Sequence, residues 1–133
     1  MIRIDDDELD LDGDLCLYEG HPFTGVSYEP GTEGKLLSEV EYKNGFATGI
    51  TKRWYPSGQL KEEFSCKRGL RHGESTTWFD NGCIKIKAEY ELGIELGYQE
   101  WNESGDLVES RELDPESVQA NLLKRHREMY ADW

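Results

Sequence analysis

The chain has 133 residues, the length of a single domain. Hydrophobic residues make up 36% and charged residues 32%, with a mean hydropathy of −0.78, so a large single core is not expected. Four Trp, seven Tyr and four Phe argue against plain disorder. No apolar run approaches the roughly 20 residues of a membrane span, and the first eight residues do not resemble a secretory signal. Three cysteines cannot all pair within the chain, which favours a reducing, cytoplasmic location.

The formal net charge of −13 is unevenly distributed along the chain. Residues 1–34 carry a net charge of −9 and residues 95–116 a net charge of −7, whereas residues 35–94 carry +2 and residues 117–133 carry +1. Such a surface repels nucleic acid and anionic lipid and speeds the encounter with a basic protein. The charge therefore predicts neither a nucleic-acid partner nor a membrane partner.

Glycines recur in three columns with a period of 24 residues, and the fourth unit lacks one residue between Gly97 and Trp101. The first column holds Gly25, Gly49, Gly73 and Gly97, the second holds Gly34, Gly58 and Gly82, and the third holds Gly45, Gly69 and Gly93. Between glycines, apolar and polar residues alternate, as in Leu60–Lys67, which is typical of a half-buried strand. The sequence therefore predicts a mainly β fold, an antiparallel meander of hairpins with about seven or eight strands.

The last twenty residues leave the repeat and predict a helix. Asp114 is expected as its N-cap, with Pro115 in the first turn. Trp133 and Met129 need burial, so a helix that caps the open end of the sheet is favoured over one that docks a partner. We expect one domain: residues 1–113 with an acidic lead over 1–14 and repeats from residue 15, and a C-terminal capping α-helix over 114–133.

The repeat, introduced by the phrase Leu17–Gly25, resembles the MORN-repeat variant of the bacterial YwqK-type antitoxin family over about residues 15–113. The resemblance implies a small β-meander protein that neutralises a co-encoded toxin. It implies no catalytic residue, so none is assigned.

Candidate chemical sites are few. Residues 8–19 approach an EF-hand loop, but Glu8 stands at the first position and Pro22-Phe23 follows where a helix is required, so an acidic turn before a strand is favoured and no metal is expected. The three histidines lie on separate segments, without the spacing of zinc ligands. Cys66 is interpreted as a small core residue. No phosphate loop or paired carboxylate is found, so we expect no cofactor and no enzymatic activity.

Aromatic residues recur along one side of the meander and are candidate anchors for a partner: Trp54, Tyr55, Trp78, Phe79 and Trp101. The alternative, which we favour, is that they form a ladder between neighbouring hairpins.

The leading hypothesis is a cytoplasmic immunity protein that binds a basic, nuclease-like toxin stoichiometrically, as a monomer or weak homodimer. Two acidic groups are predicted to steer that toxin to the sheet. The first comprises Asp5, Asp6, Asp7, Asp10, Asp12 and Asp14, and the second comprises Glu95, Glu100, Glu103, Asp106 and Glu109. The alternative is a non-catalytic scaffold or self-assembling module, since an exposed meander edge can pair with a second copy.

Overall fold

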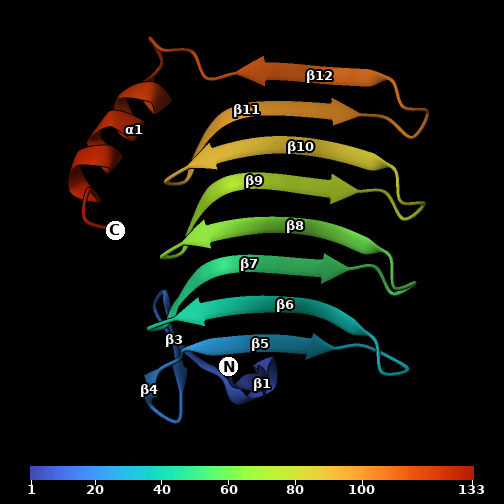
Figure 1. The fold of residues 1–133 in the computed structure, drawn as a ribbon, viewed down its shortest axis with the longest axis vertical. Helices are drawn as coiled ribbons and strands as arrows, with labels where there is room; N and C mark the ends of the chain where they lie inside the picture. The colour runs from blue at the N-terminus through green and yellow to red at the C-terminus, as the bar shows by residue number, and fades with distance from the viewer.

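The computed structural model describes all 133 residues and confirms the predicted hairpin meander (Figure 1). Eight repeat strands follow one another in chain order across one open sheet, each antiparallel to the next. They are β5 (Gly25–Pro30), β6 (Leu36–Lys43), β7 (Phe46–Trp54), β8 (Leu60–Lys67), β9 (Leu70–Trp78), β10 (Ile84–Glu91), β11 (Ile94–Trp101) and β12 (Leu107–Glu112). None of the helices has the length and apolarity needed to span a bilayer.

The acidic lead adds strands that the sequence did not predict. β1 (Arg3–Asp5) pairs in parallel with β5 and becomes the ninth strand of the sheet. A short 3₁₀ helix, η1 (Asp6–Glu8), then leads to a separate three-stranded sheet. That sheet consists of β2 (Asp10–Asp12), β3 (Leu15–Tyr18) and β4 (His21–Pro22). The lead therefore covers the first end of the meander.

The two faces of the large sheet differ in chemistry, as the alternation predicted. One face, here called the aromatic face, carries Phe64 and Tyr98 together with the small residues Thr51 and Ser75. All four lie in one cross-strand row. The opposite face, here called the charged face, carries the lysines and glutamates that alternate with these residues. Thr51 and Ser75 are each only 4% exposed, so the middle of the aromatic face is closed by its own neighbouring side chains.

Arg71 covers part of the aromatic face. Its guanidinium carbon lies 4.0 Å from the centre of the Phe64 ring and 5.5 Å from that of Tyr90. Its Nη2 lies 3.3 Å from a carboxylate oxygen of Glu62. An arginine held over two aromatic rings shields them from water while keeping its own charge paired. Cys66 is half-buried beside this cluster, and burial raises the pKa of its thiol.

The first buried cluster lies where the small sheet meets the large one. Cys16 is 2% and Phe23 3% exposed, and the Phe23 ring packs against Tyr18 and Tyr42 with centroid separations of 6.1 and 5.8 Å. Gly45 connects the two sheets through its backbone, because its N–H donates to Phe23 O and its carbonyl accepts from Cys16 N.

The second buried cluster lies under α1 (Val118–Met129), on the side of the sheet where β8 turns into β9 and β10 into β11 (Figure 1). Leu92, Ile94 and Leu123 form its centre. The predicted C-terminal capping helix is confirmed, but it packs at the hairpin turns and leaves the free edge of β12 uncovered.

Two details of the helix prediction are wrong. Ser117 is the N-cap, because its Oγ accepts the Ala120 N–H at 3.1 Å, while Asp114 instead accepts the Glu116 N–H in a turn before the helix. Met129 is 65% exposed and does not contribute to the core. The buried residues of the helix are Ala120 and Leu123.

Polar contacts fix the helix in place. Arg127 binds the Glu91 carboxylate through two hydrogen bonds of 2.6 and 2.8 Å. His126 Nδ1 lies 2.9 Å from Leu92 O, and the Leu92 N–H donates to His72 Nδ1 at 3.0 Å. The β10–β11 turn is thus bound from two directions.

Replacing Gly45 with alanine should separate backbone strain from steric collision. Gly45 has a φ of +88°, and an added Cβ would collide with the Leu15 side chain, whereas Gly58 has a φ of +96° and open space. We expect Gly58→Ala to cost about 1 kcal/mol of unfolding free energy, from backbone strain alone. Gly45→Ala should cost at least about twice as much. Equal losses in urea unfolding would contradict the close packing of the two sheets.

Removing the Arg127 side chain that binds Glu91 should lower the stability of the folded chain, by an amount that depends on pH. The hydrogen bond from Arg127 is the main cause that lowers the pKa of Glu91 below its ordinary 4.5. A lowered pKa gives stabilisation that is complete above pH 4.5 and is lost as the pH falls through the folded-state value. Arg127→Ala should lower the midpoint of urea unfolding at pH 7, with Arg125→Ala as the exposed control. A difference from wild type that persists at pH 2 would contradict this account.

Candidate protein-binding surface

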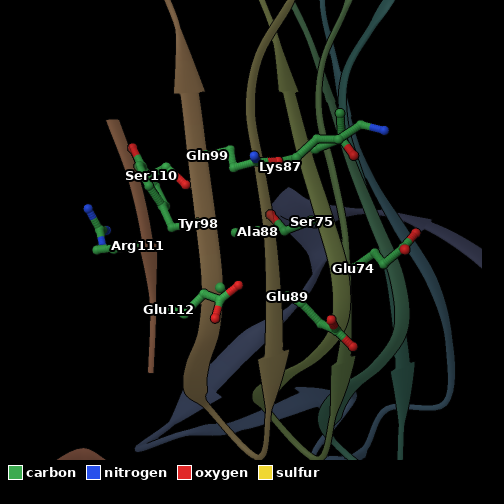
Figure 2. Close-up of a pocket in the computed structure, with 12 residues that line it drawn as sticks. Glu74, Ser75, Lys87, Ala88, Glu89, Tyr98, Gln99, Ser110, Arg111 and Glu112 are labelled. Atoms are coloured by element: carbon green, nitrogen blue, oxygen red, sulfur yellow. The ribbon is translucent and has the colours of Figure 1, made fainter. Parts of the chain in front are cut away.

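An open trough of about 320 Å³ lies over the last four strands, β9 to β12. Gly97 is part of its lining, and its position in the sheet is directly opposite Glu89 on one side and Glu112 on the other. Glu74 is in turn opposite Glu89, so three glutamates stand in one cross-strand row on the charged face (Figure 2). A Cβ on Gly97 would meet no atom within 4 Å.

The trough results from the residue missing in the fourth repeat. Gly49 and Gly73 have φ values of +99° and +103°, and each sits in a bulge that the partner strand covers. The Glu41 carboxylate folds over Gly49 and accepts the Ile50 N–H, and an added Cβ on Gly73 would press on the Ser65 hydroxyl. Gly97 does not have a positive φ, because its strand is one residue shorter and the bulge is smaller. The space above it stays open.

The charges around the trough suit a cationic side chain. Glu74, Glu89 and Glu112 take part in no ion pair, and Lys87 is the cation of the trough lining that shares their face. Thr76, Gln99 and Ser110 add hydroxyl and amide groups to the lining. The arrangement can therefore bind a lysine or arginine of a partner through carboxylates that are already exposed.

The other face of β12 is internally neutralised. Arg111 lies 3.7 Å from the centre of the Tyr98 ring and donates to Glu95 at 2.7 and 3.1 Å and to Glu109 at 2.7 Å. These hydrogen bonds, that to Glu95 foremost, raise the pKa of Arg111. Tyr98 donates its hydroxyl to Glu100 at 2.7 Å. Three members of the second predicted acidic group are thus engaged within the chain.

The remaining acidic candidates lie at two opposite ends of the long axis (Figure 1). Glu103 and Asp106 are exposed in the turn between β11 and β12. The N-terminal group surrounds η1 and the small sheet, where Asp5 accepts the Asp7 N–H at 3.0 Å. Burial is the main cause that raises the pKa of Asp6, and the carboxylate of Glu29 adds to it. The two groups therefore form separate patches.

The aromatic candidates lie where the strands reach the turns opposite α1. Trp54, Trp78 and Trp101 are all half-buried, and Tyr55 donates its hydroxyl to Trp78 O at 2.7 Å. That bond joins one hairpin to the next, in the manner of a ladder. Phe79, also half-buried, has the ammonium group of Lys85 5.6 Å from its ring centre.

The residues around η1 and β2 show how the acidic lead is arranged. The loop that resembles an EF-hand forms the β2–β3 hairpin, with Asp10 opposite Leu17. Carboxylate oxygens of Asp5, Asp6 and Asp7 lie within 4.8 Å of one another.

The sequence patterns did not single out Glu74, Glu89 or Glu112. The missing residue after Gly97 was the signal that could have indicated their shared trough.

Comparison with known proteins identifies the chain as a MORN-repeat protein. A family model described as MORN repeat variant matches residues 47–65 and 71–92, which contain the hairpins of β7–β8 and β9–β10. Immunity protein YwqK of Bacillus subtilis (strain 168) is 49% identical over 111 residues, which are 84% of this chain and 72% of that protein. The chain belongs to the same family of MORN-repeat variant proteins as YwqK, which confirms the predicted resemblance. No solved structure matches it significantly.

The Tyr98–Glu100 contact gives a test of the geometry beside the trough. The hydrogen bond to Glu100 is the main cause that raises the pKa of Tyr98 to about 12. Glu100→Gln should return the Tyr98 pKa towards its ordinary 10, because the neutral amide no longer opposes a phenolate. Ultraviolet titration can isolate this tyrosine by subtracting the curve of Tyr98→Phe. A pKa near 10 in the wild-type chain would contradict the contact.

Proposed function

We propose that this chain is an immunity protein that binds the toxic domain of a cognate, co-encoded toxin and neutralises it by stoichiometric contact. The observation that carries the proposal is the 49% identity, over most of both chains, to a protein named as an immunity protein. The surface adds support, because the trough over Gly97 offers exposed carboxylates without intramolecular partners. Such a surface favours a basic partner, for which a nuclease is the natural candidate.

In this proposal the chain works in the cytoplasm and performs no chemistry. It acts by covering the toxin's active site or the path by which substrate enters it. A rigid sheet suits this task because the interface backbone need not rearrange on binding. The relevant quantity is therefore the lifetime of a one-to-one complex.

Two measurements test the proposal directly. The first is a mild-salt pull-down from the native host, read by mass spectrometry, in which one stoichiometric toxin should dominate. The second is co-expression of that toxin with this chain in a bacterial host, which should restore growth. Recovery of the bait alone, or of cell-envelope components, together with no protection, would overturn the proposal in favour of a scaffold.

Charge reversal separates steering from the final contact. Two double variants reverse equal charge at opposite ends of the sheet: Asp10→Lys with Asp12→Lys, and Glu103→Lys with Asp106→Lys. None of these four carboxylates is in an ion pair. Because the second pair is nearer the trough, it should slow association with the toxin by about tenfold at low salt and flatten its salt dependence. Stopped-flow association rates that neither pair changes would refute steering.

A further inference from the structure

The sheet ends in a strand that nothing covers. β12 is last in the sheet order, and all six of its residues are exposed. At the other end, the lead and the small sheet lie against the first strands, while α1 stays at the hairpin turns (Figure 1). Leu107 and Val108 are 52% and 55% exposed, so this edge also carries apolar surface. An exposed edge of this kind is a template for another strand.

The backbone of β12 fixes which groups the edge offers. The Leu113 N–H donates to Leu96 O, and the same register places Arg111 opposite Tyr98. Inward and outward groups alternate along an antiparallel strand. The N–H and C=O groups of Arg111 and Leu113 therefore face β11, and those of Ser110 and Glu112 face away from the sheet.

The negative charge around the β12 edge favours one of two possible occupants, a second copy of this chain or a basic strand of another protein. A second copy of this chain would bring two segments of net charge −7 together (residues 95–116), which like-charge repulsion opposes. A basic strand would instead lie directly beside Glu112, with Glu89 two strands further in across Gly97, and neither glutamate has a cationic partner. The charge therefore favours a basic partner.

We propose that an extended basic segment of a protein partner adds to the free edge of β12 as a further strand of the sheet. This inference rests on the proposed function and specifies how the toxin is bound. Residues of that segment opposite Ser110 and Glu112 lie on the charged face, where a lysine or arginine reaches Glu112 and the trough. Main-chain hydrogen bonds supply affinity, and the acidic row selects the partner.

The test removes one outward N–H without touching the inward ones. Proline is tolerated on an edge strand where its missing N–H would face solvent. Ser110→Pro should therefore keep the fold, checked by circular dichroism and thermal unfolding, but block the added strand. Ser110→Ala, which keeps the N–H, is the matched control. With the toxin domain recovered by the pull-down, Ser110→Pro should raise Kd at least about tenfold and Ser110→Ala less than about twofold.

Glu112→Pro, with Glu112→Gln as its control, repeats the test at the next outward N–H and covers the case in which Ser110→Pro does not fold. Unchanged affinity in both proline variants would overturn the edge inference while leaving the proposed function intact. Failure of the wild-type chain to bind the toxin would instead overturn the proposed function. A wild-type homodimer in sedimentation, dispersed by Ser110→Pro, would assign the edge to a second copy and overturn the basic strand.

Discussion

A single-layered sheet has no second layer to pack against, and this constraint governs the rest of the molecule. Only eight hydrophobic residues are buried, and they gather mainly at its extremities, around Phe23 and under α1. Between these clusters each hairpin depends on its neighbours, through the backbone ladder and through contacts such as Arg71 over Phe64. Stability is thus a sum of nearest-neighbour terms, with the first end of the sheet covered by β1 and the small sheet and with α1 packed at the hairpin turns.

The two ends of the sheet differ in whether another element covers them, and this asymmetry connects the structure to the proposed function. The first end is covered by β1, η1 and the small sheet, whereas β12 keeps an open edge beside an acidic trough. The open edge persists because α1 turns back to the β10–β11 turn, where Glu91 and Arg127 fix it. The proposed function requires a rigid surface that is free to accept a toxin and that does not pair with a second copy of the chain. Acidic residues around the bare edge meet both needs.

The sequence predicted the hairpins well because glycine columns mark positions where the backbone requires φ values that other residues resist. It could not predict the parallel pairing of β1, since three residues carry no periodic signal. It misplaced the N-cap because Asp114 and Ser117 both suit a helix start, and only packing selects between them. The trough depends on which strands lie side by side. Glu74 and Glu89 are 15 residues apart in the sequence, and Glu89 and Glu112 are 23 apart. Only the pairing of β9 to β12 brings these three glutamates into one site.

Residue-resolved amide hydrogen exchange on the free chain tests the central claim, that β12 is a paired strand with a bare outer edge. The account predicts fast exchange at Ser110 and Glu112, near the rate of an unstructured peptide, and protection of at least about 100-fold at Arg111 and Leu113. Equal protection at all four amides would contradict the account, because the outer edge would then already be covered.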